Sequence, residues 1–171
     1  SSSSSSDPSY MKFDWNFLKK TSNAYISRLN KIYEDMMKRN DVEYLTGTAS
    51  FTGQEGEVSV GSKTYTADHI LIAVGGEPNM PATIPGIEFC ISSDGFFGLE
   101  TQPKRCAVVG AGYIGVELSG VLQALGTKTD LFFHGPSVLT GFDDFVVHAL
   151  EDEMKKQQLN TYPEQSPASI M

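Results

Sequence analysis

The sequence predicts an α/β protein in which a doubly wound βαβ unit follows a helix and a β-meander. Three observations predict this fold class. Apolar residues recur at helical spacing over residues 16–39. Short segments of strand-forming residues, separated by glycines, occupy residues 42–66. Short apolar runs then alternate with longer amphipathic stretches over residues 105–162, the order expected of parallel strands joined by helices.

The first part of the chain predicts one long helix and several strands. The helix of residues 16–39 stops at Asn40-Asp41. A strand is predicted over residues 42–51, and residues 57–66 predict an antiparallel hairpin. The apolar run of residues 70–74 predicts a strand buried on both faces, as in a parallel sheet.

The second part of the chain begins with a proline-rich stretch. Its prolines indicate that residues 77–104 form a linker, with a short helix or turn at residues 94–99. The βαβ unit follows. Its predicted elements are a buried strand at 105–109, a helix at 113–125, a strand at 128–133, a helix at 143–158 and a strand that begins at 159.

Composition excludes several classes of function. The 171 residues suffice for one domain, or for a small domain with part of another. The formal net charge is −8 and no long basic run occurs, so we expect neither nucleic acid nor an anionic membrane as a partner. No stretch reaches the roughly 18–20 apolar residues of a membrane-spanning helix. The serine-rich residues 1–12 predict a disordered or non-native tail.

The cysteines predict neither redox chemistry nor metal binding within this chain. Cys90 and Cys106 are too far apart in the sequence to form a CxxC or CxxxxC pair. No clustering of histidine and cysteine suggests a zinc site. We therefore expect two buried free thiols and a reducing compartment, either the cytoplasm or an organelle interior.

The strongest motif is Gly110-Ala111-Gly112-Tyr113-Ile114-Gly115, called the glycine turn below. It follows a predicted strand and opens a predicted helix, as the dinucleotide-binding motif of Rossmann-type domains requires. Gly110 permits the tight turn, Gly112 lets a pyrophosphate approach the backbone, and Gly115 lets helix and strand pack closely. The helix N-terminus favours the phosphate charge. The alternative is a glycine-rich turn that holds no ligand.

The end of the second strand of such a unit usually selects the nucleotide. NAD sites place an acidic residue there, and NADP sites place an arginine nearby. Here residues 131–135 contain neither, and Thr140 is neutral as well. His134 is the polar candidate. It is either a weak, pH-dependent phosphate contact or a loop histidine with no role.

The glycine turn belongs to a wider resemblance. Together with Glu117 and the segments at residues 25–33, 65–73 and 91–97, it resembles the glutathione reductase family of FAD-dependent pyridine nucleotide-disulfide oxidoreductases. The resemblance is collinear from about residue 13 to residue 170. Members of that family use FAD, NADPH and a redox dithiol to reduce glutathione disulfide, and they work as homodimers.

The resemblance implies roles for individual residues. Ala111, Ile114 and Glu117 would contact the nicotinamide nucleotide, and Tyr113 would cover the flavin. Other positions would meet FAD, namely Thr48, Ala49, Val74 and Gly75. Tyr33 would lie in the disulfide-substrate site, although from the residues alone it reads as a core aromatic on a helix.

The sequence also departs from the family pattern. His134 and Thr140 stand where the family has the two arginines that bind the NADPH phosphate, which makes a preference for NADPH doubtful. The FAD motif and the redox dithiol would lie before residue 1, and the interface domain of the homodimer after residue 171. No catalytic residue and no metal ligand is therefore predicted here, and the chain alone is expected to be inactive.

The domain organisation follows from these comparisons. The expected divisions are a tail at 1–12, part of an FAD-binding domain at 13–76, a linker at 77–104 and a C-terminally truncated NAD(P)-binding domain at 105–171. Three functional hypotheses remain. The chain is part of a disulfide reductase, a non-catalytic NAD(P)-binding module, or a degenerate truncated product.

Overall fold

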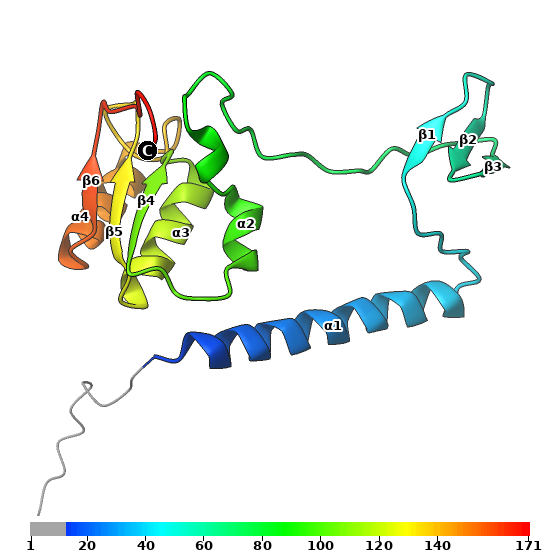
Figure 1. Ribbon diagram of the computed structural model, residues 1–171, viewed down its shortest axis with the longest axis horizontal. Coiled ribbons are helices and arrows are strands. Elements are labelled where there is room, and N and C mark those ends of the chain that lie inside the picture. The colour runs from blue at the N-terminus through cyan, green and yellow to red at the C-terminus, as the bar shows by residue number, and fades with distance from the viewer. Residues whose placement is uncertain (1–12) are drawn as a thin grey trace, which may run out of the picture. The chain divides into compact units, whose positions relative to one another are not determined.

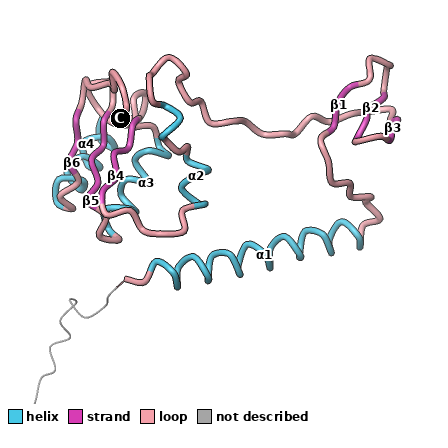
Figure 2. Tube along the Cα trace, in the orientation of Figure 1, coloured by secondary structure: helices cyan, strands magenta, loops and turns pink. Residues whose placement is uncertain are grey.

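The computed structural model describes residues 13–171, so the predicted tail at residues 1–12 lies outside the described residues. The described chain forms two compact units. Unit 1 combines residues 13–16 with Pro78–Met171, and unit 2 is Phe17–Glu77. Figures 1 and 2 show the elements of both units. No helix of the described part is long and apolar enough to cross a membrane.

A parallel three-stranded sheet organises unit 1 and confirms the predicted βαβ order (Figure 1). The strands β4 (Arg105–Val109), β5 (Lys128–Phe132) and β6 (Asn160–Tyr162) lie side by side in that order. Helix α3 (Tyr113–Ala124) connects the first pair, and α4 (Asp144–Lys156) connects the second. The glycine turn therefore lies at the carboxyl end of β4, where α3 begins.

The core of unit 1 lies between the helices and one face of the sheet. Side chains alternate along β5, so that Thr129 and Leu131 are buried while their neighbours are more exposed. Leu131 and Val138 have no exposed surface. The apolar core cluster consists of Ala111, Val116, Leu131, Phe133, Val138, Leu139, Val147, Met154 and Leu159.

The opposite face of this sheet is only partly covered. There the Phe132 and Tyr162 rings stack with centroids 4.5 Å apart, and the Asn160 amide donates a 2.7 Å hydrogen bond to Asp130. On β4, Val109 is 57% exposed. The prediction that residues 105–109 form a strand was confirmed, but the prediction that this strand is buried was wrong. Within the described residues β4 is an edge strand, and only its α3-facing side chains are shielded.

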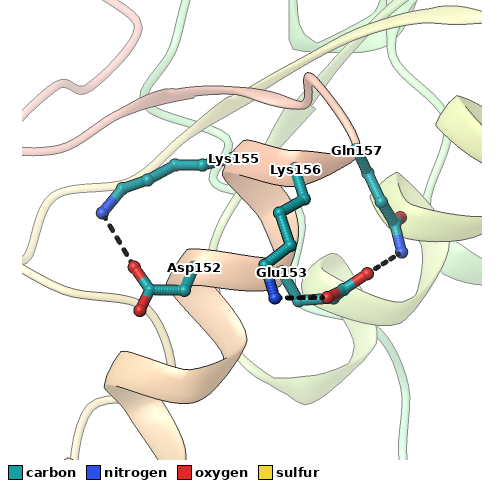
Figure 3. Close-up of polar contacts among 5 residues, drawn as sticks. All are labelled: Asp152, Glu153, Lys155, Lys156 and Gln157. Atoms are coloured by element: carbon teal, nitrogen blue, oxygen red, sulfur yellow. Dashed lines mark hydrogen bonds and ion pairs between the residues drawn. The ribbon is translucent and has the colours of Figure 1, made fainter.

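Helix α4 has well-defined ends. At its N-terminus the Asp143 carboxylate accepts a 2.9 Å hydrogen bond from the Phe145 backbone N–H, as its sequence position predicted. Ion pairs and an amide occupy its last turns (Figure 3), and they involve Asp152, Glu153, Lys155, Lys156 and Gln157. Hydrogen bonds from Gln157 and Lys156 lower the pKa of Glu153.

Two short helices lie in the predicted linker and belong to unit 1. They are η2 (Ile87–Phe89) and α2 (Ser93–Gly98), which begins one residue before the predicted turn. The Trp15 indole N–H donates to the Leu99 carbonyl at 3.2 Å, and its ring meets Phe96 edge to face. This contact holds the first turn of helix α1 in unit 1.

Unit 2 contains most of α1 (Trp15–Arg39) and an antiparallel sheet of β1 (Ala49–Phe51), β2 (Glu57–Val60) and β3 (Lys63–Thr66). The helix is continuous, and the predicted hairpin forms between β2 and β3 with Val60 paired to Lys63. Both elements confirm the sequence prediction.

Two predicted strands of unit 2 were wrong in whole or in part. The strand expected over residues 42–51 is limited to β1. The apolar run at residues 70–74 is not a strand, and its Leu71 and Val74 are 89% and 88% exposed. A buried parallel strand requires neighbouring strands on both sides, and the described residues supply none for this segment.

Candidate dinucleotide-binding site

The glycine turn begins with a backbone conformation that favours glycine. Gly110 has φ +105°, outside the region that L-residues with a side chain adopt easily. Its N–H donates a 2.8 Å hydrogen bond to the Phe132 carbonyl at the end of β5. The turn is therefore fixed to both adjacent parallel strands.

The last glycine of the turn is required by close packing. A Cβ atom on Gly115 would overlap the carbonyl oxygen of Gly110 and would lie 3.8 Å from a Val108 methyl group. The first turn of α3 thus rests directly on the end of β4. This is the packing role that the sequence motif assigns to the third glycine.

Gly112, by contrast, faces open space. It is the N-cap of α3, with φ −67° and ψ 172°, and a Cβ there would meet nothing within 4 Å. No side chain caps the helix at this position. The first N–H groups of a helix have no partner within the helix, so they are available to an anion. The residues therefore fit a pyrophosphate group, with room above Gly112 and donors beside it.

A cavity of about 410 Å³ adjoins the turn. Tyr113 and Ile114 line it and are 62% and 42% exposed. Cys106 also lines it, and partial burial raises the pKa of this thiol. Most of the remaining wall is apolar and includes Met80, Ile91, Phe96, Leu118 and Leu122. Such a lining suits the flat, weakly polar part of a ligand better than its phosphates.

A second loop lies against the glycine turn. This segment, residues 134–141, follows β5 and is called the β5 loop below. The Leu139 N–H donates a 2.8 Å hydrogen bond to the Ala111 carbonyl, and the Leu139 side chain is buried. A Cβ on Gly135 would lie 3.3 Å from the Thr140 hydroxyl, so the two ends of the loop meet. Because His134 adjoins Gly135, His134 and Thr140 both lie close to this meeting point.

Leu139 was missed by the sequence reasoning. Its φ of +50° is a left-handed conformation that costs a leucine roughly 1–2 kcal/mol. Burial of the side chain and the hydrogen bond to Ala111 offset that cost. Sequence offers little signal for it, because glycine or asparagine is the usual residue in this conformation. The nearest hint is Gly141, two residues later, with φ +92°.

The structure brings together the predicted nucleotide residues but not all predicted site residues. The glycine turn, Glu117 and the β5 loop all belong to unit 1. The remaining predicted residues belong to unit 2, where Thr48 precedes β1, Ala49 begins it, and Val74 and Gly75 lie on the extended segment after β3. Tyr33 lies on α1 and is 53% exposed, so the alternative view of it as a core aromatic was wrong.

Cys90 and Cys106 are both free, and each is half-buried rather than fully buried as expected. Among the described residues, no group of three or more histidine, cysteine, aspartate or glutamate side chains is arranged to hold a metal ion.

A parallel βαβ unit with a glycine turn at a helix N-terminus defines a dinucleotide-binding protein of the Rossmann class. The family model for pyridine nucleotide-disulphide oxidoreductases matches residues 3–170, and the chain belongs to that family.

Curated relatives agree with this family, and a solved structure shares the fold of the chain. The chain is 46% identical over 156 residues to a glutathione reductase of Schizosaccharomyces pombe, covering 88% of this chain and 33% of the relative. It is 47% identical over 164 residues to a glutathione reductase of Yarrowia lipolytica, covering 90% and 35%. The chain therefore spans about a third of the length of these relatives. The HOCl-induced flavoprotein disulfide reductase RclA of Escherichia coli shares the fold, with a TM-score of 0.83 at 20% identity over 94% of this chain and 38% of that one.

Proposed function

We propose that this chain forms the central part of a glutathione-disulfide reductase and that its own task is to bind a reduced nicotinamide dinucleotide at the glycine turn. Two findings support the proposal. Relatives that share 46–47% of its residues over most of its length are glutathione reductases. The turn itself is open at Gly112 and tightly packed at Gly115, as a pyrophosphate site requires.

The geometry at Gly112 is the observation that carries the proposal. A reduced nicotinamide dinucleotide bound here would supply a hydride, and FAD would supply the redox chemistry between that hydride and a disulfide. The role of the residues of this chain would be to bind and orient the nucleotide. The N-terminus of α3 would receive the pyrophosphate, and Tyr113 and Ile114 line the adjoining cavity. By the family resemblance, Ile114 and Glu117 would flank the nucleotide and Tyr113 would cover the flavin side.

The FAD and substrate contacts in unit 2 belong to the same proposal. Thr48 and Ala49 would contact the adenine side of FAD, and Val74-Gly75 would lie near the same cofactor. Tyr33 would contact glutathione disulfide. The similarity to glutathione reductases across both units supports these roles. By the same family resemblance, the whole protein would be a homodimer in a reducing compartment.

The 171 residues by themselves do not complete the reaction under this proposal. Cys90 follows η2 and Cys106 lies within β4, and neither thiol has a disulfide partner. Without a dithiol, electrons have no route to glutathione disulfide. We therefore expect the chain alone to bind nucleotide without oxidising it when glutathione disulfide is added.

The test compares two glycines of α3 by isothermal titration calorimetry with NADPH and NADH. Gly112→Ala places a methyl group where the pyrophosphate would lie, so we expect affinity to fall by about tenfold or more. Gly120→Ala is the matched control, because a Cβ there also meets nothing within 4 Å but lies beyond the turn. We expect it to bind like the unaltered chain.

Three outcomes discriminate the hypotheses. Loss of binding in Gly112→Ala alone, with circular dichroism unchanged, supports the site. Absence of binding by the unaltered chain contradicts it and favours a degenerate product. Equal binding by both variants shows that the nucleotide lies elsewhere.

A further inference from the structure

Positive charge in unit 1 is confined to one edge of the parallel sheet. Lys104 and Arg105 lie at the start of β4, and Lys128 begins β5, with Arg105 and Lys128 side by side in the register. The other lysines of this unit, Lys155 and Lys156, are in the last turn of α4, which leads into β6. Every lysine and arginine of Pro78–Met171 therefore lies towards the amino ends of the strands.

The nucleotide site lies at the other edge. The glycine turn follows the carboxyl end of β4, and the β5 loop follows that of β5. A five-residue strand spans roughly 13 Å and a 13-residue helix roughly 20 Å. Both lengths exceed the Debye length of about 8 Å at physiological salt. Lys155 and Lys156 are in addition paired with Asp152 and Glu153 at 3.4 Å (Figure 3).

The carboxyl edge instead carries carboxylates. Asp143 caps α4 and accepts from the Phe145 N–H, so this helix terminus is already satisfied by an aspartate. Asp144 follows it, and the Glu164 backbone N–H donates to the Gly135 carbonyl of the β5 loop. The loop itself carries no lysine, arginine or acidic residue, and its His134 side chain is exposed.

From this distribution we infer that the site accepts NADH at least as readily as NADPH and does not select for the 2′-phosphate. The inference rests on the proposed function and specifies its nucleotide. A 2′-phosphate brings up to two negative charges and needs a fixed cation, ideally an arginine fork. A free 2′-hydroxyl needs only a neutral hydrogen-bond partner, which the Thr140 hydroxyl or the His134 imidazole can supply.

The experiment titrates the full chain with NADH and with NADPH in a calorimeter at about pH 8. Three proteins are compared: the unaltered chain, the double variant His134→Arg/Thr140→Arg, and the control Thr101→Arg/Ala124→Arg. The control adds the same charge at exposed positions near the amino edge, at the linker before β4 and at the last residue of α3.

We expect the unaltered chain to bind NADH with a Kd no larger than that for NADPH. The arginine pair in the β5 loop should tighten NADPH binding by about tenfold or more, because each guanidinium can make charge-assisted hydrogen bonds to the 2′-phosphate. It should leave NADH within about threefold, a difference below 1 kcal/mol. The control should change neither the affinity for NADPH nor the affinity for NADH.

The outcomes separate the two proposals. If the unaltered chain binds neither nucleotide, the proposed function falls and the inference falls with it. If it binds NADPH tenfold more tightly than NADH, the inference alone is overturned and the proposed function stands. If the control tightens NADPH as much as the double variant does, general charge and not the β5 loop controls the nucleotide, which also overturns the inference.

Discussion

At the scale of residues, the first and last glycines of the glycine turn have structural roles, whereas the role proposed for the middle one, Gly112, is to admit a ligand. Gly110 adopts a backbone conformation with positive φ, and Gly115 lets α3 pack directly against the end of β4. Gly112 leaves open space at the N-terminus of α3. The same residue type is therefore needed for three different reasons. A substitution at each position should fail in its own way.

Gly115→Ala should destabilise unit 1. Its Cβ would overlap the Gly110 carbonyl oxygen, a backbone atom that cannot move aside without shifting the turn. Overpacking of this kind costs roughly 1–3 kcal/mol. Urea unfolding followed by circular dichroism measures the change. Gly120→Ala on the same helix is the reference, and equal midpoints for the two variants would contradict the packing described above.

At the scale of elements, the sequence predicted the nucleotide-binding unit well because its signals are local. Helix α3 is delimited by glycines and by the apolar strands on either side of it. The start of α4 is marked by the Asp143 cap. The hairpin of β2 and β3 was predicted for the same reason, since its turn is two residues long. Leu139 could not be found in this way, because its conformation depends on a tertiary hydrogen bond.

The failed strand predictions have one cause. Residues 70–74 have the composition of a buried strand, but a strand forms only where a neighbouring backbone offers hydrogen bonds. β4 is a second example. Its composition is that of a central strand, but it lies at the edge of the described sheet. Composition thus indicates that a segment can form a strand, and the presence of neighbouring strands determines whether it does and on which faces it is buried.

Helix α1 should exchange its amide hydrogens faster than α3. Of its 25 residues only Trp15 is buried, and large apolar side chains such as Phe17, Ile26 and Tyr33 are 50–68% exposed. α3 is held by Val116, Ser119 and Leu122. Few buried contacts allow local opening at little free-energy cost. Hydrogen exchange followed by mass spectrometry tests this, and equal protection of the two helices would show that α1 has a partner surface.

At the scale of the whole molecule, the boundary at Glu77 and Pro78 separates two units of unequal cohesion. Unit 1 contains the apolar core cluster. Unit 2 contains a small antiparallel sheet whose strands show no fully buried residue. Each unit should therefore respond to proteolysis separately.

Thermolysin, which cleaves before exposed apolar residues, should cut first within residues 70–74. Leu71, Ile72 and Val74 are 64–89% exposed on a segment without regular structure. The expected product extends from this segment to Met171 and resists further digestion. Mass spectrometry of a time course identifies it. First cuts inside α3 or β5 would contradict the assignment of the core to unit 1.

The contact between Trp15 and α2 gives the molecule an optical reporter. Trp15 is the sole tryptophan of the chain, and it is buried against Phe96, a residue that also lines the cavity beside the glycine turn. The emission of Trp15 should be blue-shifted while the first turn of α1 contacts α2, and it should shift to the red when this first turn detaches. A reduced nicotinamide in the cavity would absorb this emission through energy transfer. One fluorophore would thus report the docking of α1 by its colour and the occupancy of the site by its intensity.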